Sequence, residues 1–155
     1  MSLHSKQSGF TLIEMMIVIA ILAVLSGIAI PNYLAYLPKS RLNGAARQVM
    51  GDLMAARMQA VKLNHRVKVF FYSNHEYKIC DDANNDMIVD DGEGDVQLRD
   101  IQTEYYDVTL SANNNPIFKP NGTASNLPTI NLDSLSNSSW SKSITISSAG
   151  RVKIN

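Results

Sequence analysis

Residues 10–30 read FTLIEMMIVIAILAVLSGIAI, and Glu14 carries the only ionisable side chain among them. An α-helix of this length reaches about 30 Å, the thickness of a bilayer core. Apolar side chains occupy every face of such a helix, which excludes a soluble amphipathic helix. The segment is therefore predicted to span a membrane during at least part of the protein's life.

A polar leader precedes the apolar run. Residues 1–9 contain Lys6 and end at Gly9. A conventional secretory signal would have a short apolar core, then a cleavage site with small residues and a polar mature start. Removal of residues 1–9 would instead leave the apolar helix in the mature chain, which would begin at Phe10.

The junction at residues 6–14, KQSGFTLIE, resembles the type III signal of the type IV pilin and type II secretion pseudopilin superfamily. The resemblance implies that a prepilin peptidase cuts after Gly9 and methylates the new N-terminus at Phe10. It also implies a structural subunit, not an enzyme, that an inner-membrane platform assembles with other pilins. Before assembly the helix would lie in inner-membrane lipid with the head in the periplasm. Afterwards the subunit would lie in a periplasmic pseudopilus or an extracellular pilus.

Glu14 is a candidate functional residue because a carboxylate inside a bilayer is energetically costly. Cleavage would place it four residues from the new α-amino group, in the first helical turn, where the helix dipole favours a negative charge. The resemblance implies that Glu14 pairs with the Phe10 amine of a neighbouring subunit. A charge at the start of the helix, at the membrane surface and without a partner, is the alternative.

The helix is expected to continue through residues 31–65. Pro31 and Pro38 each remove an intrahelical hydrogen bond, so a bend is predicted near both. Beyond them, spacings of three and four predict an amphipathic helix whose apolar stripe packs on the following domain rather than in a coiled-coil seam. The stripe comprises Leu42, Ala46, Val49, Leu53, Ala56, Ala60 and Leu63. The opposite face, directed to solvent or neighbouring subunits, carries Arg41, Arg47, Arg57 and Lys62.

From Arg66 the hydrophobic period changes to two. Residues 67–72 and 76–80 flank Ser73-Asn74-His75 and predict a hairpin. Further strands are predicted at 95–104, 107–110, 116–118, 128–133, 143–147 and 150–154, with loops at 111–115, 121–126 and 134–139. The fold class is α+β, a long N-terminal helix packed on a small antiparallel sheet domain at residues 66–155.

Other segments resemble the GspH/FimT-like branch of the superfamily: AARMQAV at 55–61, VQLR at 96–99, IFKPNG at 117–122 and ISSAGRV at 146–152. This resemblance implies a minor pilin or pseudopilin. A major pilin stays open as an alternative, although such heads more often carry a C-terminal disulfide loop. Cys80 is the only cysteine, so no intrachain disulfide can form.

Residues 81–95 hold seven of the 14 acidic side chains. Oxygen ligands fall at positions 1, 3, 5, 7, 9 and 12 of an EF-hand-like register, namely Asp82, Asn84, Asp86, Ile88 through its carbonyl, Asp90 and Glu93. Met87 occupies position six, where glycine normally makes the turn, at a cost of about 1–2 kcal/mol. A calcium site, as in a calcium-stabilised major pilin, and an acidic hairpin tip without metal are both open.

The C-terminal segment, GRVKIN at 150–155, puts Arg151 and Lys153 on one side of an extended chain. It imperfectly resembles the basic tail of FimT-type minor pilins that bind DNA during natural transformation. Two or three phosphate contacts would give weak, salt-sensitive binding. The formal net charge of zero excludes a surface that is basic throughout. DNA binding is thus a second hypothesis, and an ordinary terminal strand is its alternative.

Overall fold

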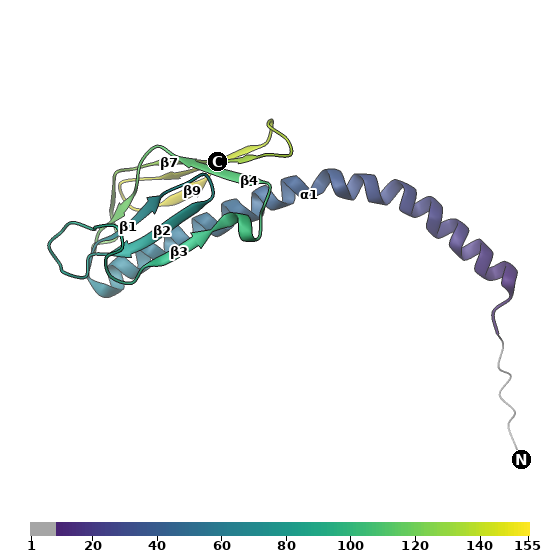
Figure 1. Ribbon diagram of the computed structural model, residues 1–155, viewed down its shortest axis with the longest axis horizontal. Helices are drawn as coiled ribbons and strands as arrows, with labels where there is room; N and C mark the ends of the chain where they lie inside the picture. Colours follow the sequence, from purple (N-terminus) through teal and green to yellow (C-terminus); the bar gives the residue numbers. More distant parts are fainter. Residues whose placement is uncertain (1–8) are drawn as a thin grey trace, which may run out of the picture. The chain divides into compact units, whose positions relative to one another are not determined.

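A computed structural model describes residues 9–155, so the leader residues 1–8, including Lys6, lie outside the described residues. The chain separates into two compact units, one ending at Leu37 and the other comprising Pro38–Asn155. Helix α1, Leu12–Leu63, begins in the first unit and ends in the second (Figure 1). The helix assignment is unbroken at Pro31 and Pro38. A bend at each proline stays a prediction.

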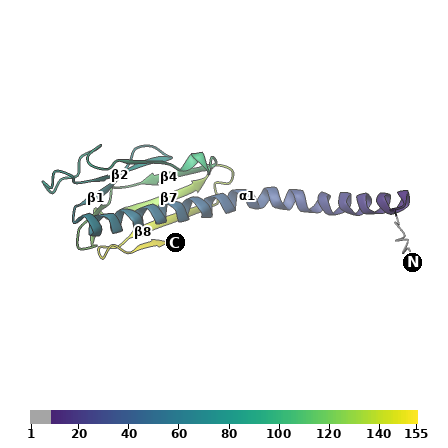
Figure 2. The same ribbon diagram turned by 90° about the horizontal axis from the view of Figure 1, so that it is seen from below.

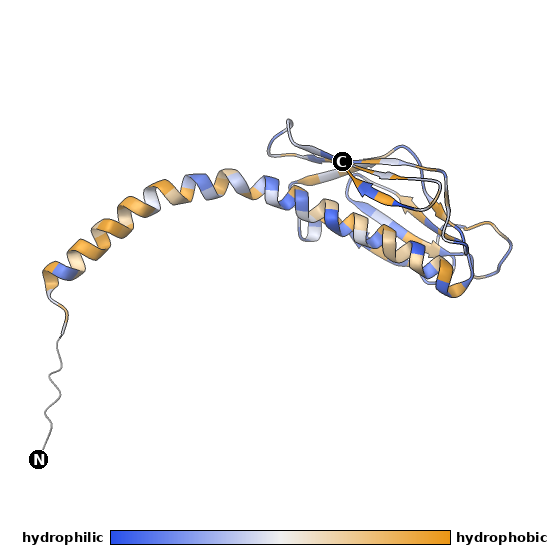
Figure 3. Ribbon diagram, turned by 180° about the vertical axis from the view of Figure 1, so that it is seen from behind, coloured by the Kyte–Doolittle hydropathy of each residue, from blue (hydrophilic) through white to orange (hydrophobic). Residues whose placement is uncertain are grey.

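In the first unit, α1 is long and apolar enough to cross a membrane. Every residue from 9 to 36 is exposed. Figure 3 shows most of this part of the helix coloured as hydrophobic, with a hydrophilic patch near its start and another near its end. An exposed surface of this kind is stable only when lipid or another protein covers it.

The second unit contains two antiparallel sheets in addition to the end of α1. Sheet A has the order β3-β2-β1-β5-β6, with β1 at Val67–Phe71, β2 at Glu76–Asp81, β3 at Gln97–Asp100, β5 at Ile117–Phe118 and β6 at Ala124–Ser125. Sheet B has the order β4-β7-β8-β9, with β4 at Val108–Ala112, β7 at Thr129–Ser134, β8 at Ser141–Ile146 and β9 at Val152–Ile154. The predicted α+β class is confirmed.

The core lies between the second half of α1 and the inner faces of both sheets (Figure 2). The buried stripe of the helix comprises Leu42, Ala45, Ala46, Val49, Leu53, Ala56 and Ala60. Its four alanines let the helix backbone approach the sheets closely. The predicted packing on the following domain is therefore confirmed. Leu63 is an exception: it is the last residue of α1 and is 42% exposed.

The predicted hairpin is confirmed, because β1 pairs with β2 in a register that places Lys68 opposite Cys80. The strand predicted at 95–104 is too long. It ends at Asp100, whose side chain accepts a hydrogen bond from the Gln102 amide and begins a 3-10 helix, η1 (Ile101–Thr103). The loop predicted at 121–126 contains the short strand β6, which pairs with β5.

Candidate assembly and ligand sites

The first site lies at the start of α1. The Thr11 hydroxyl accepts a hydrogen bond from the Glu14 amide at 3.2 Å, and the Glu14 carboxylate accepts one from the Thr11 amide at 3.4 Å. This reciprocal pair is a capping box, which satisfies two backbone N–H groups that have no partner within the helix. The carboxylate therefore lies beside the backbone N–H of the residue that follows Phe10.

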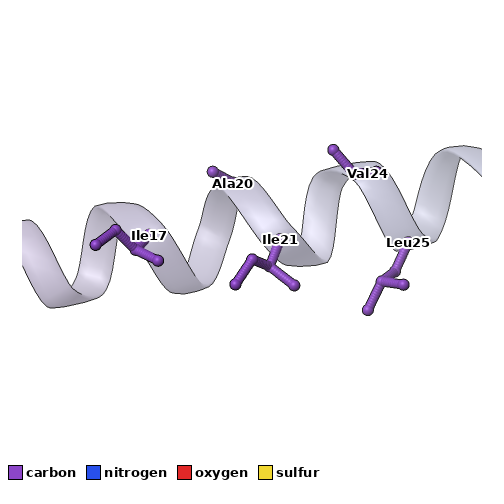
Figure 4. Close-up of a pocket in the computed structure, with 5 residues that line it drawn as sticks. All are labelled: Ile17, Ala20, Ile21, Val24 and Leu25. Atoms are coloured by element: carbon purple, nitrogen blue, oxygen red, sulfur yellow. The ribbon is translucent and has the colours of Figure 1, made fainter.

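An apolar hollow of about 370 Å³ lies further along the same helix. Its lining consists of Ile17, Ala20, Ile21, Val24 and Leu25 (Figure 4). Ala20 has the smallest side chain of the five, so the helix surface is lowest there. An acyl chain or an apolar side chain of another helix suits such a surface, because no polar group of the lining would need a partner.

A second apolar stripe lies on α1 in the head, and the sequence prediction missed it. Met54, Met58 and Val61 are 41%, 72% and 52% exposed. A hollow of about 550 Å³ adjoins Met58 and is also lined by Ala55, Gln59, Lys62, Leu63, Asp95 and Gln97. Spacings of four and three residues join Met54, Met58 and Val61 and could have indicated a stripe. The buried stripe of the same helix has the same spacings, so the pattern alone does not separate an exposed stripe from a buried one.

The prediction that Arg57 faces solvent or neighbouring subunits is wrong. Its Nε donates to the Gly122 carbonyl at 2.8 Å, and its Nη2 donates to the Ala149 carbonyl at 3.3 Å. Gly122 and Gly150 have φ angles of 77° and 75°, which favour glycine. A Cβ on Gly150 would overlap the Gly122 carbonyl and approach Arg57. The segments 55–61, 117–122 and 146–152, which resemble the GspH/FimT-like branch, thus meet around the Arg57 guanidinium group.

Arg41 also departs from the predicted solvated face. Its guanidinium lies 3.5 Å from the Asp107 carboxylate, which is 3% exposed, and 4.3 Å from the centroid of the Tyr106 ring. Arg47 and Lys62 are exposed, as predicted. Contacts with residues distant in the sequence thus determine which basic side chains of the helix are exposed to solvent.

Asp52 links the middle of α1 to sheet A. It accepts a hydrogen bond from the Tyr77 hydroxyl at 2.5 Å and lies 3.7 Å from the Arg99 guanidinium. Burial of the Tyr77 ring, together with the hydrogen bond to Asp52, raises the pKa of its hydroxyl well above the usual range. Tyr77 therefore stays protonated and keeps donating at alkaline pH.

The acidic loop follows β2 and adopts much of the expected register. Met87, at position six, has a φ of 73°. The side chain of Asp82 accepts from the Asp86 and Met87 amides, and that of Asp86 accepts from the Ile88 amide. Glu93 accepts from the Asn84 and Asp90 amides, so the side chain at position twelve closes the loop.

Basic neighbours offset part of this loop's charge. The Arg66 guanidinium donates to the Met87 carbonyl at 2.6 Å, and the Lys78 ammonium lies 3.3 Å from the Asp91 carboxylate. Within residues 9–155, no three acidic side chains of the loop bring one ligand oxygen each within 4.8 Å of one another. The candidate ligands are ordered by their own backbone rather than gathered around one point.

Arg151 and Lys153 are exposed at the C-terminal edge of sheet B, with the buried Val152 between them. Lys153 lies opposite Thr145 in the β8–β9 register. Lys142 lies two residues before the buried Ile144 on the same strand, so it is on the opposite face of the sheet from Lys153. The outward face therefore presents two of these three bases.

The N-terminal segment and the head each match a known family model. A model described as the prokaryotic N-terminal methylation motif matches residues 4–30. A model described as type II transport protein GspH matches residues 45–150, more than half of the chain. The chain belongs to the GspH family. The resemblance to the pilin and pseudopilin superfamily is thereby confirmed, and this family consists of structural subunits rather than enzymes.

Curated relatives of this GspH-family protein include fimbrial proteins. Fimbrial protein Q of Moraxella bovis is 49% identical over 53 residues, which are 34% of this chain and 31% of that protein. Prepilin peptidase-dependent protein D of Escherichia coli (strain K12) is 62% identical over 37 residues, 24% of this chain and 25% of that protein. The chain thus spans a third or less of the length of these relatives.

Two solved structures share the fold of this GspH-family protein. The type IV minor pilin FimU of Pseudomonas aeruginosa superposes with a TM-score of 0.58 at 17% sequence identity. The aligned residues cover 76% of this chain and 90% of the FimU chain. The minor pseudopilin EpsH of Vibrio cholerae superposes with a TM-score of 0.58 at 8% sequence identity. The aligned residues cover 74% of this chain and 96% of the EpsH chain. At these identities the likeness concerns the fold alone.

Proposed function

We propose that this GspH-family protein is a minor pilin or pseudopilin, held first in the inner membrane and then in a filament by α1. The observation that carries the proposal is the exposure of every residue from 9 to 36 on a helix apolar enough to span a bilayer. During assembly the helix exchanges lipid neighbours for the helices of other subunits. Van der Waals packing around small side chains such as Ala20 drives helix association of this kind.

Processing precedes assembly in this proposal. A prepilin peptidase cuts after Gly9 and methylates Phe10, and the match of residues 4–30 to the methylation motif supports this step. The inner-membrane platform then adds the subunit to a periplasmic pseudopilus or an extracellular pilus. The head remains outside the membrane throughout.

Glu14 sets the register between subunits in this account. Cleavage converts the amide nitrogen of Phe10 into an α-amino group, four residues before Glu14 and directly before Thr11, its partner in the capping box. The Glu14 carboxylate can exchange its 3.4 Å contact with Thr11 for the amine of a neighbouring subunit. Pairing of the two charges removes the cost of leaving either one alone in an apolar environment.

The test is Glu14→Ala in cells that express the full chain. We expect the variant to be processed normally, because the cut lies outside the helix, but to be absent from sheared filaments. Met16→Ala, which changes the same exposed helix without removing a charge, should appear in filaments at the parent level. Normal incorporation of Glu14→Ala would contradict the pairing role, whereas loss of processing would place Glu14 in peptidase recognition.

We also propose that the acidic loop binds calcium. The left-handed conformation of Met87 and the contacts of Asp82 and Asp86 support an EF-hand-like register. Calorimetric titration of the detergent-solubilised chain with calcium should release heat that Asp86→Asn diminishes. No heat at millimolar calcium would reject the site.

DNA binding through Arg151 and Lys153 is a second candidate function, favoured by the exposure of both side chains on one edge of sheet B. Few phosphate contacts predict binding that is detectable at low salt and lost at physiological salt. A mobility-shift assay should therefore show a shift that the double change to alanine abolishes. No shift of the parent chain at low salt would remove this function.

A further inference from the structure

A second group of ionisable side chains lies away from the acidic loop. His75, Glu76 and Asp100 each offer a ligand atom, and the three atoms lie within 4.8 Å of one another. His75 ends the turn between β1 and β2, Glu76 begins β2, and Asp100 ends β3. Glu76 and Asp100 lie directly opposite each other in the β2–β3 register. Side chains directly opposite on neighbouring strands project from the same face of the sheet.

The two carboxylates lack a compensating charge. The three ion pairs among residues 9–155 use the carboxylates of Asp107, Asp91 and Asp52, so neither Glu76 nor Asp100 takes part in one. Like charges directly opposite each other on paired strands are destabilising. Both side chains are also half-buried, which weakens their screening by water. A cation between them would relieve this repulsion.

The His75 imidazole has polar neighbours at its Nδ1. Its Nδ1 lies 2.8 Å from the Asn74 amide oxygen and 3.5 Å from the Ser73 hydroxyl. A neutral imidazole carries its proton on one ring nitrogen and offers the lone pair of the other to a metal ion. A hydrogen bond from the other ring nitrogen is the usual way in which proteins fix the tautomer of a metal-binding histidine.

The backbone around the group is held from two sides. The His75 carbonyl accepts from the Ile101 amide at 3.0 Å, and the Asn74 carbonyl accepts from the Leu110 amide at 2.7 Å. One oxygen of Asp100 accepts from the Gln102 amide, and one oxygen of Glu76 lies 3.5 Å from the Ser73 hydroxyl. Each carboxylate therefore keeps its second oxygen for a ligand.

We propose that His75, Glu76 and Asp100 form a binding site for a divalent transition metal ion, with zinc as the ion that fits the donors best. One imidazole and two carboxylates suit zinc more than calcium, which prefers oxygen ligands alone. Three protein ligands leave a coordination position for water or for a group of another molecule. The site depends neither on filament assembly nor on the acidic loop.

The test is a zinc titration of the full chain in detergent micelles, without a histidine tag, followed by calorimetry and by the absorption bands of cobalt as a substitute ion. We expect one ion per chain. His75→Gln and Asp100→Asn should each weaken zinc binding at least tenfold. Asp100→Asn is the sharper variant, because an asparagine side chain still caps η1 and so preserves the local fold.

Controls separate this site from other ligands in the chain. His65→Gln removes an imidazole elsewhere, and Asp86→Asn alters the acidic loop; both should bind zinc like the parent chain. Unchanged Trp140 fluorescence in every variant shows that the head is folded. The proposal is overturned if millimolar zinc does not bind, if His75→Gln and Asp100→Asn bind zinc normally, or if Asp86→Asn alone abolishes binding.

Discussion

Arg57 joins α1 to both sheets through a single side chain. The Gly122 carbonyl that it contacts lies between β5 and β6 of sheet A, and the Ala149 carbonyl lies between β8 and β9 of sheet B. A guanidinium group presents its donors in a fixed planar geometry, so it can hold two carbonyls at once. The residue therefore has a role in the stability of the head that its place on a basic helix face did not indicate.

We expect Arg57→Ala to lower the free energy of unfolding by about 2 kcal/mol, because it removes two hydrogen bonds from a charged donor and leaves carbonyls without partners. Arg47→Ala, which changes an exposed arginine on the same helix, should stay within about 0.5 kcal/mol of the parent. Urea unfolding followed by Trp140 fluorescence measures both. Equal effects of the two variants would contradict the specific role of Arg57.

Tyr77 makes the free energy of unfolding of the head depend on pH in the alkaline range. Burial and the hydrogen bond to Asp52 raise the pKa of its hydroxyl in the folded chain. In the unfolded chain a tyrosine loses its proton near pH 10, at about its ordinary pKa. The unfolded state then binds fewer protons than the folded state, so stability is intact below about pH 10 and falls above it.

Tyr77→Phe removes this hydroxyl, so the folded and unfolded states no longer differ in the proton that Tyr77 binds. The loss of stability above about pH 10 should become shallower by up to about 1.4 kcal/mol per pH unit. Tyr106→Phe, which changes an exposed tyrosine, is the control and should keep the parent slope. Urea midpoints between pH 9 and pH 11 decide the question, and identical slopes for the parent and Tyr77→Phe would refute it.

At the scale of elements, α1 has two apolar stripes within the head. One is buried under the sheets, and the other, Met54, Met58 and Val61, is exposed. An exposed apolar stripe on a helix is typical of a protein–protein contact. In a filament subunit the neighbouring subunits are the natural partners of this stripe.

Met58→Glu should therefore lower the share of the protein found in sheared filaments and leave the urea midpoint unchanged, because the side chain is 72% exposed. Leu135→Glu, at a residue that is 66% exposed between β7 and β8, is a control outside the helix. Immunoblots of filament and membrane fractions give the ratio. If the two variants assemble equally well, the exposed stripe is not an assembly contact.

Local patterns predicted some of these elements and not others. An uninterrupted apolar run predicted the first part of α1, and spacings of three and four predicted its second part. Alternation around Ser73-Asn74-His75 predicted the β1–β2 hairpin. All of these signals lie within short windows of sequence. Strand β6 has two residues and exists through its pairing with β5, so no period could indicate it. Strand β3 ends at Asp100 because the Asp100 side chain accepts a hydrogen bond from the Gln102 amide and caps η1. Alternation of apolar and polar residues does not predict such a contact.

For the whole molecule, the candidate sites also divide into those that a local sequence pattern predicts and those that depend on contacts between distant residues. Gly9, Phe10 and Glu14 form one contiguous motif, which the sequence displays directly. The contacts of Arg57 and Arg41 reach 65 and 66 residues along the chain, so their burial could not be predicted from helix periodicity. The same holds for His75 and Asp100, because the β2–β3 register alone brings them together.

Mass spectrometry of filaments sheared from cells that express the full chain would show whether α1 holds a processed subunit in the filament. We expect a tryptic peptide that begins at Phe10, ends at Lys39 and carries a methyl group on its α-amino nitrogen. A chain found only in the membrane fraction, or one whose N-terminus in the filament fraction is not Phe10, would contradict this expectation.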